Sequence, residues 1–192
     1  MHQSTKMHGE TGSGNKATPY LRNMYQLNDN DYSAYYRPYM EGLPSSDILT
    51  FLENQRQEVL AFLQTIPEEK WDYAYGPGKW TIKEVCSHVS DSEIIFGYRT
   101  LCIARGETQS LPGYDENAYV ANGNFKELDF QQIIQTWLKA RGLNLSLFET
   151  ISEEGWEHVG IANNNRMKAA AVPFIIAGHT RHHMRIIKER YL

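Results

Sequence analysis

The sequence KAAAVPFIIAGHTRHHMRIIKER, residues 168–190, carries the pattern that decides the fold. Its apolar residues recur every three or four positions, the spacing at which side chains share one face of an α-helix. This pattern predicts a helix that ends near Arg190. The helix begins near either Lys168 or Pro173, because a proline can open a helix in its first turn or bend it farther in.

Two histidines lie in the middle of the apolar face of this helix. With about 100° of rotation per residue and His179 at zero, the apolar side chains from Val172 to Ile187 centre near roughly +20°. On this wheel His183 lies at about +40° and His182 at about −60°, so His179 and His183 form the inward pair. One metal ion shared by this pair would give both buried imidazoles a partner. The alternative is a pair of core histidines satisfied by hydrogen bonds.

Three more helices are predicted upstream, over residues 46–66, 81–105 and 129–151. The first has N-cap oxygens at its start and a proline after its end. The second opens with the capping-box pattern of Thr81 and Glu84 and is stopped by a glycine. No convincing series of alternating strands is visible, although residues 159–166 could form a short hairpin. The economical architecture is an all-α four-helix bundle.

A long connection joins the second and third helices. Residues 106–128 contain Pro112, glycines and other turn formers, so they predict a crossover on the bundle surface, where substrate selection is expected. The tyrosine-rich stretch 19–44 predicts an irregular arm laid over the core. Residues 1–18 have no periodic apolar pattern and predict a flexible N-terminal tail, which leaves residues 19–192 as a single domain.

Charge and composition exclude several classes of function. A formal net charge of -4 gives no general attraction to nucleic acid or to anionic lipid, so neither partner is expected. The polar N-terminal stretch lacks the apolar run of a secretory signal, and no stretch is long enough to cross a membrane, so we expect a cytoplasmic protein. Cys86 and Cys102 lie too far apart on one predicted helix to bond each other, so reduced core thiols are expected.

The third metal ligand is expected from another helix, and His88 in the second helix is the best-placed candidate. It lies in a polar stripe beside an apolar face, which is typical of a pocket wall or of a solvated side. Three imidazoles without a thiolate or carboxylate resemble an open catalytic site more than a closed structural zinc site. Imidazole suits several metals, and we expect Zn2+, with Ni2+ or Fe2+ as alternatives.

Other polar residues near this histidine are candidates for chemistry. Asp91 and Glu84 lie one turn from His88 and could orient an imidazole or act as a base, although solvated charges are the simpler interpretation. Arg99 lies farther along the helix and could bind a substrate carboxylate or form an ion pair. The substrate-pocket rim is expected to contain Trp80, Tyr114, Asp115 and Tyr119, with packing as an equal alternative for the aromatic residues.

Five sequence blocks follow one another in a fixed order. They are YGPGKWTIKEV (75–85) leading to His88, FGYR (96–99), ARG (104–106), LPGYDENAY (111–119), and IIAGH (175–179) continuing to ERYL (189–192). Together they make the chain resemble DinB-like proteins, and within them the YfiT-like metal-dependent hydrolases and bacillithiol transferases, from about Tyr32 to Leu192. The resemblance implies a four-helix bundle, often a homodimer, that binds a divalent metal through His88, His179 and His183.

The function expected from these observations is that of a metal-dependent thiol S-transferase or hydrolase. In relatives of this kind a low-molecular-weight thiol is activated at the metal for transfer to an electrophilic small molecule, and water would serve equally in hydrolysis. The alternative is a non-catalytic bundle that only binds a metal or a small molecule. A pocket open to solvent at the metal would favour the enzyme, and a fourth protein ligand would favour a structural site.

Overall fold

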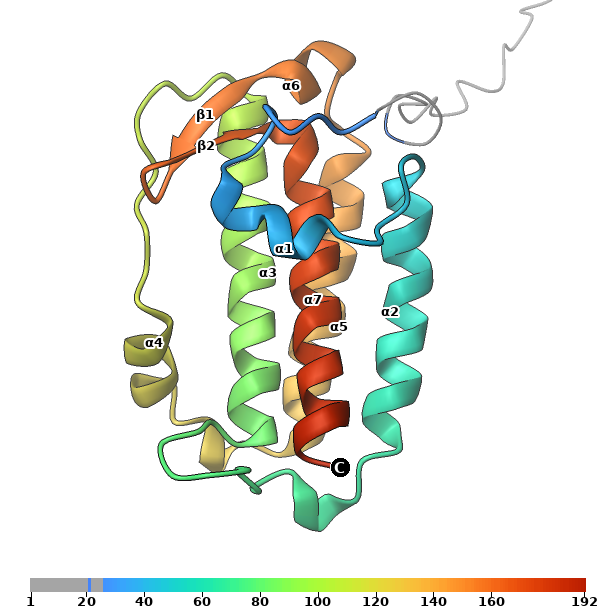
Figure 1. Ribbon diagram of the computed structural model, residues 1–192, viewed down its shortest axis with the longest axis vertical. Helices are drawn as coiled ribbons and strands as arrows, with labels where there is room; N and C mark the ends of the chain where they lie inside the picture. Colours follow the sequence, from blue (N-terminus) through green and yellow to red (C-terminus); the bar gives the residue numbers. More distant parts are fainter. Residues whose placement is uncertain (1–20, 22–25) are drawn as a thin grey trace, which may run out of the picture.

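Four long helices run side by side in the computed structural model, which describes residue 21 and residues 26–192 (Figure 1). They are α2 (Ile48–Gln64), α3 (Ile82–Ala104), α5 (Phe130–Phe148) and α7 (Val172–Arg190). Helices α2 and α7 run in one direction and α3 and α5 in the other, so the parallel pair α3 and α5 needs a long crossover. The predicted all-α four-helix bundle and its crossover are confirmed, and the predicted tail lies outside the described residues.

Three of the four long helices, α2, α3 and α5, begin where the sequence supplies a side-chain cap. The Thr81 hydroxyl accepts the Glu84 N–H at 3.2 Å, and the Glu84 carboxylate accepts the Thr81 N–H at 2.7 Å. Asp129 and Gln132 form the same reciprocal arrangement at the start of α5, and Asp47 caps α2. These caps satisfy N–H groups that have no partner within the helix, which explains why these three helices start close to the predicted places.

A hairpin closes one end of the bundle. Strands β1 (Val159–Ala162) and β2 (Asn165–Lys168) pair antiparallel, and the residues between them, Asn163 and Asn164, have φ angles of 50° and 59°. Asparagine tolerates this left-handed conformation. The hairpin follows α6 (Glu153–Glu157), and η5 (Ala169–Ala171) leads from it into α7. Pro173 lies in the first turn of α7, so that helix starts at Val172.

The crossover contains more regular structure than a loop. It holds α4 (Glu116–Asn122) and η4 (Phe125–Glu127), and Figure 1 shows α4 outside α3. Leu111 ties the crossover to the hairpin, because its N–H donates to the Ile161 carbonyl at 2.8 Å and its carbonyl accepts the Asn163 N–H at 3.0 Å. These hydrogen bonds therefore hold the crossover and the hairpin against each other.

The tyrosine-rich arm lies across the bundle, as predicted. It contains η2 (Ala34–Tyr36) and α1 (Arg37–Met40), and α1 packs against α7. Figure 1 shows this arm passing in front of α3 and α7. A further short turn, η3 (Glu68–Lys70), lies in the connection between α2 and α3.

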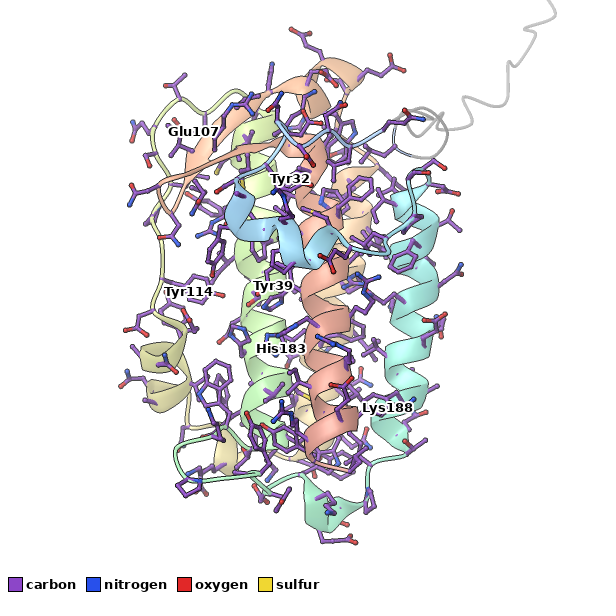
Figure 2. The ribbon with its side chains drawn as sticks, in the orientation of Figure 1. Tyr32, Tyr39, Glu107, Tyr114, His183 and Lys188 are labelled. Carbon is purple, nitrogen blue, oxygen red and sulfur yellow. The ribbon has the colours of Figure 1, made fainter. Side chains whose placement is uncertain are left out.

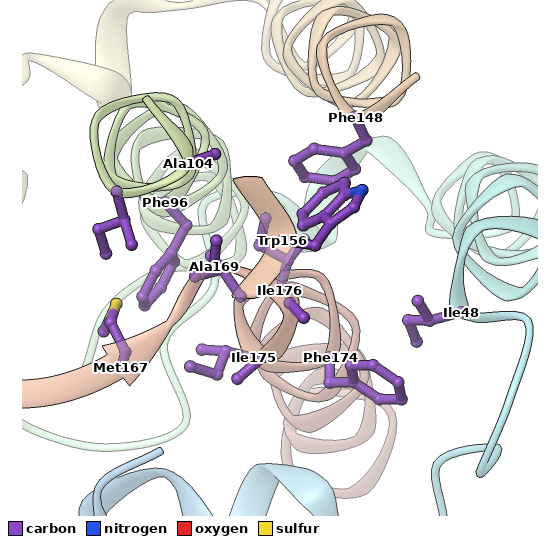
Figure 3. Packing of buried hydrophobic residues seen from close by; sticks show 14 of the residues in the cluster. Ile48, Phe96, Ala104, Phe148, Trp156, Met167, Ala169, Phe174, Ile175 and Ile176 are labelled. Carbon is purple, nitrogen blue, oxygen red and sulfur yellow. The ribbon is translucent and has the colours of Figure 1, made fainter. Parts of the chain in front are cut away.

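The apolar core consists of two clusters, one toward each end of the bundle. Near the hairpin, Phe148 and Trp156 have ring centres 5.7 Å apart and are surrounded by aliphatic side chains (Figure 3). Toward the other end, Trp71 stacks on Phe130 at 5.1 Å. Along the four helices the residues between these clusters include buried polar ones, so the middle of the bundle is where polar chemistry is concentrated.

A buried ion pair occupies part of this middle layer. The Arg141 guanidinium on α5 donates to both carboxylate oxygens of Glu93 on α3, at 2.7 and 3.0 Å. Its Nη1 atom donates to Gln55 on α2 at 3.0 Å, and Nη2, which also contacts Glu93, donates to the Thr180 hydroxyl on α7 at 3.2 Å. Asn144 adds two more hydrogen bonds to Glu93. This cluster, which we call the ion-pair cluster, joins all four long helices.

Cys86 is buried and Cys102 is partly buried. Both thiols are free, and burial raises the pKa of Cys86 to about 12, so this thiol stays protonated. In the part of the chain that the structure describes, no helix is both long and apolar enough to span a membrane.

Candidate metal centre

Three histidines meet between α3 and α7. The Nε2 atom of His179 lies 3.2 Å from Nε2 of His88 and 3.2 Å from Nε2 of His183. The ligand atoms of all three rings lie within 4.8 Å of one another. His88 and His179 are buried and His183 is partly buried. The structure thus brings together the three residues that the sequence singled out, which we call the histidine triad.

The donor set of the triad fits a divalent metal ion. Tetrahedral metal–nitrogen bonds of about 2.0–2.1 Å place neighbouring nitrogens about 3.3 Å apart, close to the two separations of 3.2 Å measured here. Hydrogen bonding alone does not satisfy the triad. The Nε2 atom of a neutral imidazole offers either one hydrogen or one lone pair, whereas that of His179 faces two partners.

Burial keeps the triad neutral. Desolvation lowers the pKa of His88 to about 4, an effect that the Glu116 carboxylate partly opposes. Desolvation and the neighbouring His88 and His182 lower the pKa of His179 to about 3. Desolvation and the neighbouring histidines also lower the pKa of His183. Neutral imidazoles keep the lone pairs through which histidine binds metals.

His182, the competing partner on α7, lies outside the triad. Its ring centre is 5.1 Å from that of His183 and 5.7 Å from that of Tyr39. It lines the same pocket, but the group of converging ligand atoms contains His183 in its place. This placement agrees with the helical-wheel argument, which put His182 at the edge of the apolar face.

A pocket of about 200 Å³ lies directly over the triad. Figure 2 shows Tyr39 of α1, Tyr114 of the crossover and His183 of α7 on the same side of the bundle. The aromatic residues of the wall are Tyr35, Tyr36, Tyr39, Trp80, Phe96 and Tyr114. Its other members are the polar residues Arg99, Glu116, Asn163 and His182. Larger hollows of about 340, 390 and 610 Å³ lie elsewhere, and none of them is lined by a histidine of the triad, so the triad pocket is the candidate site.

The arm reaches the triad because α7 has a glycine where the two segments cross. A Cβ atom on Gly178 would lie 1.9 Å from the Tyr39 carbonyl oxygen, so a larger residue would push α1 away. With glycine there, the Tyr39 ring centre lies 5.5 Å from that of His179. Arg181 donates to the carbonyls of Gly42, at 2.8 Å, and Glu41, which holds the end of the arm.

Three of the residues that the sequence proposed for the site line the pocket. The Trp80 ring centre is 5.0 Å from that of His88, and the Tyr114 hydroxyl is 2.8 Å from the Ser92 hydroxyl. Arg99 is buried and donates to the Pro112 carbonyl at 3.0 Å. Its side chain therefore joins α3 to the crossover at the pocket wall.

Four other proposed residues lie outside the pocket lining. Glu84 is engaged in the capping box of α3, and Asp91 is half-buried, which raises the pKa of its carboxyl. Asp115 caps α4 by accepting the N–H groups of Asn117 and Ala118 at 2.9 and 3.0 Å. Tyr119 is exposed, with its ring centre 5.1 Å from that of Tyr114. Asp115 and Tyr119 thus help to place the crossover, and roles for Glu84 and Asp91 in the reaction stay predictions.

The sequence analysis missed several members of the pocket wall. The sequence analysis treats Tyr35, Tyr36 and Tyr39 only as part of the arm, and it does not single out Glu116, although that residue lies within a block that resembles the family. The available signal was the density of tyrosines in the arm. Those side chains become pocket residues only through the close contact at Gly178, which no local pattern indicates.

Comparisons with known proteins agree with this architecture. The chain matches the DinB superfamily over residues 52–187. It is also similar in structure to YfiT from Bacillus subtilis, which is described as a probable metal-dependent hydrolase with an unusual four-helix bundle topology. The two chains are 16% identical with a TM-score of 0.65, and the match covers 90% of this chain and 95% of YfiT. None of the curated proteins compared with the chain matches it. Because the sequence match extends from α2 into the last turns of α7, this chain belongs to the DinB superfamily.

Proposed function

We propose that this chain is a divalent-metal-dependent enzyme that activates a thiol or a water molecule against an electrophilic small molecule. The observation that carries this proposal is the convergence of three neutral imidazoles beneath a surface pocket. Among the described residues, no cysteine or carboxylate joins the ligand group. Three protein ligands with an open position are typical of catalytic zinc sites.

Zinc is the ion that we propose, with nickel or iron as alternatives that imidazole also suits. A divalent ion held here would lower the pKa of a thiol or of water and so supply a nucleophile at neutral pH. The description of YfiT as a probable metal-dependent hydrolase supports this assignment for the superfamily fold. Transfer of a low-molecular-weight thiol to an electrophile and hydrolysis of that electrophile differ only in the attacking group.

The residues of the chain would supply positioning and proton transfer. The Trp80 and Tyr39 rings pack against the triad and form part of the pocket wall beside it. Burial raises the pKa of Tyr114, so its hydroxyl stays protonated and can donate to a substrate oxygen. Glu116 is the carboxylate of the pocket wall, and we assign it the proton released by the incoming thiol or water.

Metal content is the first test of this function. Protein purified without a histidine tag should contain about one transition-metal ion per chain, and His88→Ala should contain none. The matched control is His182→Ala, which removes a neighbouring imidazole outside the triad and should retain the ion. A wild-type protein that takes up no ion after incubation with Zn2+ would overturn the proposal.

Activity then separates the enzyme from the alternative, a bundle that only binds a metal or small molecule. The metal-loaded protein should accelerate the reaction of an electrophile such as 1-chloro-2,4-dinitrobenzene with a thiol, or the hydrolysis of an activated ester, and His88→Ala should do neither. A stoichiometric ion without any acceleration would favour the binding module. We further propose a homodimer acting on small molecules in the cytoplasm, and light scattering tests the oligomeric state.

A further inference from the structure

The triad pocket contains a buried cation without a counter-charge from the described residues. We propose that Arg99 is the anchoring site for a carboxylate, so that the substrate is a small organic acid whose reactive group lies at the triad. The position of the reactive group rests on the proposed function. The anion site itself rests only on the contacts of Arg99.

The surroundings of Arg99 leave its guanidinium available to a ligand. The side chain is 3% exposed, one nitrogen donates to the Pro112 carbonyl at 3.0 Å, and its central carbon lies 5.3 Å from the Phe96 ring centre. A guanidinium has five N–H donors. None of its nitrogens is both buried and without a partner, so the remaining donors are accessible from the pocket that Arg99 lines.

The other buried arginine of the bundle, Arg141, has the kind of carboxylate partner that Arg99 lacks among the described residues. Arg141 is fully buried and has the Glu93 carboxylate as its partner. No ion pair of this kind forms at Arg99 within residues 26–192. Buried charges in proteins are normally paired, because an isolated charge loses its hydration without compensation. A ligand carboxylate would complete the same bidentate arrangement that Arg141 makes internally.

The charged residues of the pocket also determine where a ligand carboxylate is favoured. Burial raises the pKa of Tyr36 to about 12 against the opposing effect of Arg99, whereas the effect of Glu116 is felt at His88. Arg99 lies against the Phe96 ring, whose centre is 6.3 Å from that of His179. Both Arg99 and Glu116 act on Tyr114, with opposite signs. A carboxylate in the pocket is therefore attracted by Arg99 and repelled by Glu116.

Charge balance favours a carboxylate over a phosphate. A phosphate group near neutral pH brings close to two negative charges, whereas the pocket wall offers one arginine and also carries the Glu116 carboxylate. A single negative charge on a planar group matches one guanidinium. The small volume of the pocket further restricts the ligand to a small molecule or the end of one.

The anion site is tested on metal-free protein by calorimetric titration with hexanoate and with its neutral isostere hexanamide. Wild type should bind the acid about tenfold or more tightly than the amide, as expected for a charge-assisted pair. Arg99→Met should lose this preference and keep the amide affinity. The matched control is Arg105→Met. It changes an exposed arginine outside the pocket lining and should therefore behave as wild type.

Equal binding of acid and amide by wild type, or a preference that persists in Arg99→Met, would overturn the assignment. If Arg99→Met does not fold, Arg99→Lys replaces it, and its preference should be several-fold weaker because an ammonium cannot form the bidentate pair. A full preference in the lysine variant would count against the proposal.

A second titration separates this inference from the proposed function. Cobalt-substituted protein is titrated with 6-mercaptohexanoate, and a thiolate-to-cobalt absorption band should appear that is weaker, at equal concentration, with 6-mercaptohexanamide. An acid preference in the metal-free titration without any thiolate band would refute thiol activation and leave the anion site standing. A thiolate band of equal strength for acid and amide would refute the anion site alone.

Discussion

The ion-pair cluster and the histidine triad are both buried polar groups in the middle of one bundle. They differ in whether other protein groups satisfy their hydrogen-bonding atoms. Arg141 finds protein acceptors from three other helices, and Glu93 accepts from two partners. In the triad, three ring nitrogens face one another beneath a pocket. Burial of polar side chains therefore does not by itself mark a site. A site is indicated where several ligand atoms of the same kind converge and the protein itself does not satisfy all of them.

The two clusters are also mechanically linked. Thr180, which accepts from Arg141, follows His179 directly in α7, and Gln55 donates to the Ala177 carbonyl of the same helix at 2.8 Å. The ion-pair cluster thus fixes the rotation of α7, and that rotation directs His179 and His183 toward α3. We expect changes in the ion-pair cluster to affect stability most and changes around the triad to affect stability less.

The largest effect is expected from Glu93→Gln. This change leaves the buried Arg141 guanidinium without a counter-charge, and it should lower the free energy of unfolding by about 3–5 kcal/mol in urea denaturation. Glu53→Gln is the control, because Glu53 pairs with Arg56 at the surface and should cost no more than about 0.5 kcal/mol. A loss below about 1 kcal/mol for Glu93→Gln would show that the ion-pair cluster is not a structural centre.

Acid should destabilise the metal-free protein through the triad. Burial lowers the pKa of His88 from 6.5 to about 4, so between these values the unfolded chain binds a proton that the folded chain does not, and stability falls as pH falls. From pH 7 to pH 5, wild type should lose on the order of 2 kcal/mol more than His88→Gln. Parallel pH profiles for the two proteins, measured by urea denaturation, would contradict this expectation.

Gly178→Ala should separate the arm from the triad. The added Cβ would meet the Tyr39 carbonyl, and overpacking of this kind costs about 1–3 kcal/mol. Gly142→Ala is the matched control on α5, where an added Cβ meets nothing within 4 Å. It should stabilise the helix by roughly 0.5–1 kcal/mol. Faster hydrogen exchange in residues 34–40 of Gly178→Ala alone would locate the damage in the arm.

The smallest effect is expected from Tyr114→Phe. Loss of the hydrogen bond to Ser92 should cost about 0.5–1.5 kcal/mol and should increase hydrogen exchange in α4. Tyr119→Phe, at an exposed neighbouring ring, should leave both quantities unchanged. If both tyrosine variants behave alike, the Ser92 contact does not hold the crossover against the pocket.

The features that the sequence predicted correctly depend on local geometry. The capping box of Thr81 and Glu84 acts within one turn, and the inward direction of His179 and His183 follows from the rotation of a single helix. His88 is predicted because it lies in another helix, in a polar stripe beside an apolar face. The helix ends, the short hairpin and the crossover have equally local causes.

The features that the sequence did not predict depend on the relative rotation of distant segments. Nothing near Glu93 or Arg141 indicates that they face each other, because their pairing requires the final packing of α3 against α5. The pocket role of Tyr39 requires α1 to cross α7 at Gly178. The short helix α4 was hidden within a segment rich in turn formers.

The spacing of the triad along the chain sets the order of events during synthesis. His88 and His179 are 91 residues apart, whereas Glu93 and Arg141 are 48 apart. The ribosome therefore completes the segments of the central ion pair well before it releases the last two imidazoles. The three-histidine site would be complete only after α7 has emerged and packed against α3, so a bound ion would act on the last steps of folding and not on the first.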